Sequence, residues 1–281
     1  MNSNIAAVNT LLIAAAAMVN DDSVALYSGP FKVGIDLGTA DIQTVVLDAN
    51  NQPLACYLEW ADVVRDGVVV DYHGACRIVR EQIRRAEARL GINIQQACTS
   101  FPPGTDPRIS INVIESSGIE VSNVIDEPSS VAALLGLQHA AVVDIGGGTT
   151  GTAIIEKGKV VKSVDDPTGG HHITLVLAGY HALPYEEAEL LKRRDNSGEV
   201  LSVIQPVIAK MADLVRGHIA EHRPPAIYLT GGSCSLHGFA TAFTAEFSDI
   251  DVIIPSQALY LTPLAIAAFA IAENARQASV G

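Results

Sequence analysis

Along the chain, short apolar runs alternate with longer segments in which apolar residues recur every three or four positions. The short runs predict buried strands, and the longer segments predict helices. The predicted helices cover residues 74–90, 127–137, 200–221 and 263–276, and a buried strand is predicted over 226–230. Pro128 falls in the first turn of its helix, Gly136 falls near its end, and Pro206 kinks or starts the third helix. Because strands and helices alternate throughout, the pattern predicts an α/β fold.

The N-terminal segment 5–19 is apolar and has helical spacing. The residues at that spacing are Ile5, Val8, Leu12, Ala15, Ala16 and Val19. The segment is shorter than a membrane span and lacks the basic start of a signal peptide. We therefore expect one short amphipathic helix, which packs on the body of the protein or docks onto a partner.

Two segments share one pattern: an apolar run, a glycine-rich turn, a threonine and a second apolar run. They are VGIDLGTADIQTVVLD at 33–48 and VVDIGGGTTGTAII at 142–155. Each predicts a β-hairpin in which glycines make the bend. An aspartate ends the first strand of each hairpin, Asp36 in one and Asp144 in the other. Two similar hairpins far apart in the sequence indicate two related lobes that face one cleft.

The two turns have the chemistry of phosphate-binding loops. Gly38 lets the backbone approach an anion closely, and Thr39 adds a hydroxyl donor. Ionised Asp36 and Asp144 cannot donate a hydrogen bond to a phosphate, so their expected role is to hold Mg²⁺ through water. The second turn repeats the arrangement with Gly146, Gly147, Gly148 and Thr149. For either loop taken alone, an ordinary glycine hairpin turn is the alternative.

Composition and charge narrow the function. Among 281 residues, 18 are Lys or Arg and 31 are Asp or Glu, which gives a formal net charge of −13. A nucleic-acid binder needs a cationic face, and the absence of a long basic run in this acidic chain disfavours that function. The same acidity disfavours attachment to anionic lipid. The four cysteines form no CxxC pair, which indicates small thiols in a reducing compartment rather than a zinc or thioredoxin-like site.

Together with two further motifs, the loops resemble the nucleotide motifs of the actin, Hsp70 and sugar-kinase superfamily. EPSSVAA at 127–133 is similar to a connecting helix of Hsp70 and of the bacterial actin MreB, and LTGGS at 229–233 is similar to the adenosine motif. The resemblance runs from about Lys32 to Ala272. It implies an α/β, bilobal actin-like ATPase fold, with two related ribonuclease H-like lobes around a nucleotide cleft and reduced upper subdomains. The implied division is 1–31 for the N-terminal helix and linker, 32–143 for lobe I, 144–261 for lobe II and 262–281 for a C-terminal helix returning to lobe I.

The resemblance also implies roles for single residues. Asp36 and Asp144 would orient Mg²⁺, and Glu127, at a helix start, would position the water that attacks the γ-phosphate of ATP. The expected cofactors are therefore ATP and Mg²⁺. The residues expected to contact ATP or ADP are Gly38, Thr39, Gly146, Gly147, Gly148, Thr149, Gly169, Gly170, Glu189, Lys192, Arg193, Gly231, Gly232 and Ser233.

Two groups within this set have alternative explanations. Glu189, Lys192 and Arg193 share one helix face, similar to a helix of Hsp70 that holds adenosine. A solvated ion-pair face is the alternative for these three residues. His171 and His172 lack a third ligand at metal-site spacing, so a loop near the ribose or a capped turn is expected rather than zinc.

Two positions depart from the superfamily pattern. Gly151 stands where Hsp70 has a second acid after its loop, and Ser235 stands where Hsp70 has an arginine that stacks on adenine. These departures imply weaker metal coordination and weaker nucleotide binding. They favour a slow Mg-dependent ATPase or a nucleotide-gated switch over a fast metabolic kinase.

Four further stretches carry a narrower resemblance: WADVVRDG at 60–67, SFPPGTDPRISINV at 100–113, GGHHIT at 169–174 and LTPLAIA at 261–267. They are similar to the EutJ family of ethanolamine-utilization proteins. The family implies an ATP-dependent chaperone, or a reactivating or assembly factor, whose client is ethanolamine ammonia-lyase. The implied setting is the cytoplasm, in association with shell proteins of a bacterial microcompartment. A non-hydrolysing nucleotide-binding scaffold or degenerate actin-like assembly module is the alternative, a small-molecule kinase is a third, and the oligomeric state stays open. Within the first of these stretches, the sequence also predicts a hairpin turn at 65–67.

Overall fold

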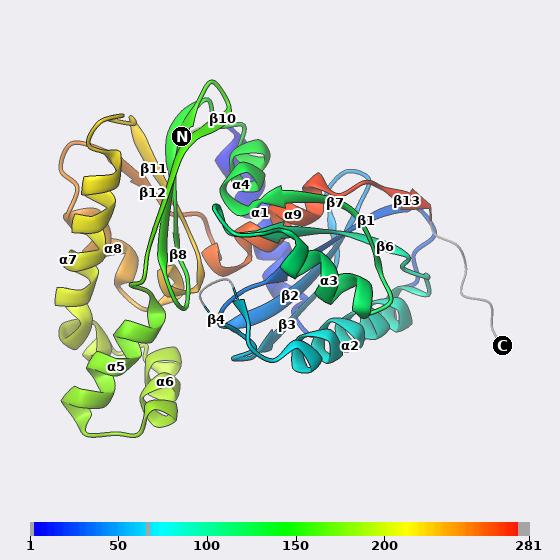
Figure 1. Cartoon of the computed structure of the whole chain (residues 1–281), viewed down its shortest axis with the longest axis horizontal. Helices are drawn as coiled ribbons and strands as arrows, with labels where there is room; N and C mark the ends of the chain where they lie inside the picture. Colours follow the sequence, from blue (N-terminus) through cyan, green and yellow to red (C-terminus); the bar gives the residue numbers. More distant parts are fainter. Residues whose placement is uncertain (1–2, 66–67, 275–281) are drawn as a thin grey trace. The chain divides into compact units, whose positions relative to one another are not determined.

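The computed structural model describes residues 3–65 and 68–274, which form two compact units (Figure 1). The first unit contains Met1–Gly136 and Tyr260–Gly281, and the second contains Leu137–Leu259. The sequence-based division predicts the boundary between lobe I and lobe II at 143/144, immediately before Asp144. The structure places it earlier, because the strand that carries Asp144, β8 (His139–Ile145), lies wholly in the second unit.

The first unit is built on one mixed sheet. Its strand order is β3-β2-β1-β6-β7, with β13 paired to the start of β1. Strands β1, β2 and β3 are antiparallel neighbours, whereas β1, β6 and β7 run parallel. The carboxyl ends of the three parallel strands therefore meet at one edge of the sheet. The bounds are β1 (Pro30–Leu37), β2 (Asp41–Asp48), β3 (Pro53–Trp60), β6 (Gln96–Phe101), β7 (Glu120–Asp126) and β13 (Glu273–Asn274).

A separate two-stranded sheet pairs β4 (Val64–Arg65) with β5 (Val68–Val69) in antiparallel fashion. The sequence predicts a hairpin turn at 65–67 between these strands. Residues 66–67 of that turn lie outside the described residues.

Helices cover both faces of the first sheet (Figure 1). Phe31, Val33 and Ile35 of β1 belong to the core that α2 and α3 complete on one face. Gly34 points to the other face, where a Cβ atom would lie 2.3 Å from the backbone nitrogen of Ala267. Glycine at this position thus allows α9 to pack directly on β1. The helices are α1 (Ser3–Ala17), α2 (Tyr72–Leu90), α3 (Arg108–Ser116), α4 (Glu127–Leu135) and α9 (Leu261–Phe269).

The N-terminal helix α1 packs on the first unit itself, against β3, α4 and α9. The Asn4 amide donates to the carbonyl of Leu135 at 3.1 Å, which ties α1 to the end of α4. Ala16 and Val19, also expected on the apolar face, are only half-buried. The protein's own body therefore covers most of this face, whose buried residues are Ile5, Val8, Leu12 and Ala15.

An extended segment after α1 lies across the end of α2. The Arg89 guanidinium donates to the carbonyls of Asp21 and Ser23 at 2.9 and 2.7 Å, and pairs with the Asp21 carboxylate at 2.8 Å. The hydroxyl and the amide of Ser23 also donate to that carboxylate, at 2.5 and 2.9 Å. These two Ser23 hydrogen bonds, followed by Arg89, lower the pKa of Asp21 to about 2.

The second unit repeats the connectivity of the first. Its strand order is β10-β9-β8-β11-β12, with two antiparallel pairs followed by two parallel pairs. Strand β8 therefore corresponds to β1, β9 to β2, β10 to β3, β11 to β6 and β12 to β7. This shared order confirms the two related lobes that the paired hairpins predict. The bounds are β9 (Thr150–Glu156), β10 (Lys159–Asp166), β11 (Ala226–Thr230) and β12 (Asp251–Ile253).

The core of the second unit lies between one face of this sheet and its helices. Val143 and Ile154 of the sheet pack with Ile208 and Met211 of α7 and with Phe243 of α8. Helix α5 contacts both α6 and α7, and Figure 1 shows α5 and α6 together. The helices are α5 (Gly170–His181), α6 (Tyr185–Arg194), α7 (Glu199–Ile219) and α8 (Phe239–Ala245), with a 3₁₀ turn, η1, at Gly232–Ser235.

Two predicted helices differ from those observed. Of the two alternatives for Pro206, the one in which it starts the helix is wrong, because Pro206 lies inside α7. The helix predicted over 263–276 ends at Phe269 as α9, and Ala270 is extended. The prediction is wrong beyond this point because Glu273 and its neighbour pair with the start of β1. Within the part of the chain that the structure describes, no helix is long and apolar enough to cross a membrane.

Candidate functional site

The first unit places two predicted carboxylates at the carboxyl edge of its sheet. Asp36 is the second-last residue of β1, and the Ser100 hydroxyl on β6 donates to its Oδ1 at 3.1 Å. Glu127 is the first residue of α4, directly after β7. The Asp126 side chain fixes this helix start by accepting from the amide of Ser129 at 3.0 Å. Because β1, β6 and β7 run parallel, Asp36 and Glu127 belong to the same edge.

The turn after Asp36 has open backbone donors. A Cβ atom on Gly38 would lie 2.9 Å from the carbonyl oxygen of Asp41, so the turn closes tightly only with glycine there. Across residues 3–65 and 68–274, the amides of Gly38 and Thr39 find no protein acceptor. Unbonded amides that follow one another in a turn are the arrangement that binds anions.

The corresponding turn of the second unit is held from outside by the start of α5. Within the turn, the Gly146 amide donates to Thr149 O at 3.1 Å. The amide of Gly170 donates to Gly146 O at 2.9 Å, and that of His171 donates to Gly147 O at 2.7 Å. A Cβ atom on Gly169 would lie 2.6 Å from the backbone of Gly148 and Thr149. The predicted glycines 169–170 thus lie directly against the predicted phosphate loop.

These contacts use the carbonyls of the turn and leave its later amides open. In the described part of the chain, the amides of Gly147, Gly148 and Thr149 donate to no protein acceptor. Asp144 is the second-last residue of β8, as Asp36 is of β1. The donor set fits the implied group, since amides and a threonine hydroxyl suit phosphate oxygens and a carboxylate suits hydrated Mg²⁺.

The predicted adenosine motif closes on the same turn. Gly231 has φ +97° and ψ 157°, and a Cβ atom there would lie 2.4 Å from Asp144 Oδ1 and 2.5 Å from the carbonyl oxygen of Ile145. The Ser233 hydroxyl donates to Gly146 O at 3.1 Å. At Gly232, by contrast, an added Cβ atom would lie 3.3 Å from the side chain of Leu259. Gly231 and Ser233 therefore shape the turn as well as the strand end from which they come.

The three charged residues of α6 bind one another and α5. Lys192 is buried, and its Nζ pairs with Glu189 Oε2 at 2.6 Å and donates to Gly170 O at 3.0 Å and Thr174 Oγ1 at 2.8 Å. The Arg193 guanidinium pairs with Glu189 Oε1 at 2.6 Å. The ion-pair alternative is thus the geometry observed, although Glu189 and Lys192 are largely buried rather than solvated.

Burial and pairing shift both titrating groups of this cluster. Burial raises the pKa of Glu189, but hydrogen bonds from Lys192 and Thr174 outweigh it and leave that pKa below its ordinary value. Burial also lowers the pKa of Lys192, and Glu189 offsets only part of that effect. Lys192 also donates to the carbonyl of Gly170, the residue whose amide donates to the predicted phosphate loop at Gly146.

The paired histidines lie in the first turn of α5, and His172 caps the start of that helix. His172 Nδ1 accepts from the Gly169 amide at 3.4 Å, and His171 Nδ1 lies 2.9 Å from the Tyr185 hydroxyl. The capped-turn expectation matches this geometry. Among the residues described, no group of three or more His, Cys, Asp or Glu side chains could hold a metal ion.

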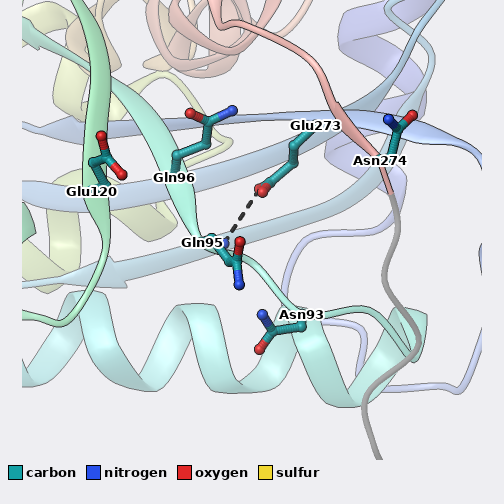
Figure 2. A pocket seen from close by; sticks show the side chains of 6 residues that line it. All are labelled: Asn93, Gln95, Gln96, Glu120, Glu273 and Asn274. Carbon is teal, nitrogen blue, oxygen red and sulfur yellow. Dashed lines mark hydrogen bonds between the residues drawn. The ribbon is translucent and has the colours of Figure 1, made fainter.

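Sequence reasoning missed two partners of the predicted residues. Ser100 donates to Asp36, and Thr174 joins Lys192 to Glu189. Both contacts join residues of separate elements, so no local motif signals them. A separate hollow of about 270 Å³ on the first unit contains none of the predicted residues (Figure 2). Its lining side chains are amides and carboxylates, from Asn93, Gln95, Gln96, Glu120, Glu273 and Asn274.

Known proteins share both the motifs and the fold. The family model of the MreB/Mbl protein matches residues 57–186, and that of the cell division protein FtsA matches residues 141–268. Ethanolamine utilization protein EutJ of Salmonella typhimurium is 51% identical over 253 residues, 90% of each chain. The crystal structure of EutJ from Carboxydothermus hydrogenoformans is 43% identical, with a TM-score of 0.88 over 95% of this chain and 100% of that one. MreB5 of Spiroplasma citri bound to AMPPNP is 19% identical, with a TM-score of 0.63 over 84% of this chain and 94% of that one.

The duplicated sheet and these neighbours define an actin-like ATPase fold, which confirms the predicted fold class. Both strand-end aspartates and both glycine turns occupy equivalent places in the two units. Because it is 51% identical to a curated relative over 90% of its length, the chain belongs to the EutJ family of ethanolamine utilization proteins.

Proposed function

We propose that this chain is a nucleotide-operated switch that binds ATP and Mg²⁺ and hydrolyses ATP slowly. The observation that carries the proposal is the pair of turns after Asp36 and Asp144. Each turn presents amides that donate to no protein acceptor in the described residues, and each follows a strand-end carboxylate. Two such turns on equivalent strands suit the phosphate chain of one nucleotide.

The proposed roles follow from these positions. Asp36 and Asp144 hold Mg²⁺ through water, and the two turns bind phosphate oxygens. Glu127 accepts a proton from the water that attacks the γ-phosphate, at a helix start whose geometry Asp126 fixes. Bound Mg²⁺ neutralises charge on the phosphates, and phosphoryl transfer needs little beyond such positioning. Gly231, Gly232 and Ser233 receive the adenosine.

The cellular role in this proposal is a chaperone, or a reactivating or assembly factor, in ethanolamine utilization. Family membership supports the setting in ethanolamine utilization, because the relatives are named ethanolamine utilization protein EutJ. The client is ethanolamine ammonia-lyase, in the cytoplasm and in association with microcompartment shell proteins. ATP and ADP favour different states of the switch, and different affinities of those states for the client supply the work.

The first test separates hydrolysis from binding. Glu127→Gln should keep ATP affinity and lower phosphate release by about 100-fold or more, because it removes the general base. Glu120→Gln is the matched control, since Glu120 is an exposed residue at the opposite end of β7. The client assay then measures ATP-dependent recovery of inactivated ethanolamine ammonia-lyase with each variant. Equal recovery with Glu127→Gln and wild type would contradict the role of hydrolysis.

A non-hydrolysing nucleotide-binding scaffold is the second candidate. The ion-paired state of Lys192 and Glu189 favours it, because these side chains already bind each other and α5. ATP binding by the wild type without phosphate release above the buffer rate would select this candidate over the slow ATPase.

A further inference from the structure

Three neighbouring strands bring two aspartates to either side of one glycine. Asp165 on β10 is the cross-strand partner of Gly151 on β9, and Gly151 is the partner of Asp144 on β8. Side chains of cross-strand partners point to the same face of a sheet. Since Gly151 has no side chain, a carboxylate stands on each side of an open position.

The Asp165 carboxylate is turned toward that position. Its Oδ1 lies 3.3 Å from the point that a Cβ atom on Gly151 would occupy. The next residue, Asp166, belongs to the opposite face, where its Oδ2 meets His218 Nε2 at 2.5 Å. The two consecutive aspartates therefore have separate tasks: Asp166 ties β10 to α7, and Asp165 shares a face with Asp144.

A second feature of the same hairpin points to a ligand at this face. The open amides of Gly147, Gly148 and Thr149 lie between Asp144 and Gly151 in the chain, at the end of the two strands. Carboxylates on alternate strands have Cβ atoms about 9–11 Å apart, twice the usual pair spacing. That span suits a cation that keeps its waters, as Mg²⁺ does in proteins.

We propose that Asp165 is a positioning residue that helps Asp144 hold the hydrated Mg²⁺ of the bound nucleotide. The Asp165 carboxylate, on the neighbouring strand, thereby lies beside Gly151, which has no side chain and supplies no carboxylate itself. The inference rests on the proposed nucleotide function and adds a residue to its metal site.

The test measures metal affinity directly, by Mn²⁺ titration of the AMPPNP-saturated full chain with electron paramagnetic resonance. Asp165→Ala should weaken Mn²⁺ binding by about tenfold or more, as expected for loss of an outer-shell partner. Ser163→Ala, two residues earlier on the same face of β10, should match the wild type. AMPPNP affinity in EDTA should be equal in all three proteins.

A rescue variant separates metal positioning from general damage to β10. Gly151→Asp combined with Asp165→Ala moves the carboxylate one strand inward, into space that Asp165 no longer contests. It should restore Mn²⁺ affinity to within about threefold of wild type. If Asp165→Ala lowers the circular dichroism signal, Asp165→Asn replaces it in the same titration.

The two proposals fail in different ways. Unchanged Mn²⁺ affinity in Asp165→Ala, with AMPPNP bound by the wild type, overturns the role of Asp165 and leaves the nucleotide function standing. Weak Mn²⁺ binding in Asp165→Ala also overturns it if the rescue variant does not restore the Mn²⁺ affinity. A wild type that binds no AMPPNP overturns the proposed function and this inference together.

Discussion

Replacing Gly231 with alanine tests how the second half of the site is built. Gly231 has φ +97° and ψ 157°, a region that only glycine adopts readily. The added Cβ atom would lie 2.4 Å from Asp144 Oδ1 and 2.5 Å from the carbonyl oxygen of Ile145. The carboxylate can rotate away, but the carbonyl moves only if β8 shifts. Gly231→Ala should therefore both destabilise the second unit and displace the carboxylate of Asp144, which is proposed to hold the metal.

The expected cost has two parts. Holding alanine in this backbone region costs about 1–3 kcal/mol. Relieving the contact with β8 costs about a further 1–3 kcal/mol, the usual range for overpacking. With a urea dependence of about 2 kcal/mol per molar, the midpoint of unfolding should fall by about 1–3 M.

Urea unfolding followed by circular dichroism measures this shift. The single tryptophan, Trp60, lies in the first unit, so its fluorescence follows that unit separately. Gly179→Ala is the matched control, because nothing lies within 4 Å of its Cβ position on α5. Alanine there should raise stability by about 0.5–1 kcal/mol. Equal midpoints for Gly231→Ala and Gly179→Ala would refute the reasoning.

Three further predictions concern the frame around the site. Lys192→Met should lower the stability of the second unit by about 2–4 kcal/mol in urea unfolding, because Glu189 loses its buried partner. A change below about 0.5 kcal/mol would contradict a stabilising role for this buried ion pair. The pKa of Asp21, measured by carboxyl NMR, should be about 2 rather than 3.8, so its contribution to stability is complete above pH 3.8 and disappears as pH falls toward 2. Leu12→Ala should cost about 2–5 kcal/mol and Ile13→Ala almost nothing, since Leu12 is fully buried and Ile13 is 56% exposed; equal losses would show that α1 does not pack as described.

The structural elements around the candidate site that the sequence predicts correctly are those with local signals. Glycine-rich bends between β-branched runs mark both hairpins, and the structure places Asp36 and Asp144 at equivalent strand positions. Pro128 and Gly136 mark α4, which begins at Glu127 and ends before Gly136 in the left-handed conformation. Such signals depend on backbone preferences of single residues, so they survive without knowledge of the fold.

The parts that the sequence does not predict depend on contacts between separate elements. Asp165 meets Gly151 only through the pairing of β10 with β9, and Ser100 meets Asp36 only through the pairing of β6 with β1. The predicted end of the last helix is wrong for the same reason. The apolar pattern continues past Phe269, but pairing with β1 makes the chain extended there. Burial of Lys192 likewise requires α5 beside α6.

The central claim is that the chain binds a nucleotide with Mg²⁺ through the carboxylates and turns of its two units. Calorimetric titration of the full chain with AMPPNP, with and without Mg²⁺, tests it most directly when wild type and Asp144→Asn are compared. The account predicts one nucleotide per chain, tighter binding with Mg²⁺, and loss of that Mg²⁺ effect in Asp144→Asn. Absence of binding by the wild type, or a Mg²⁺ effect of equal size in both proteins, would contradict it.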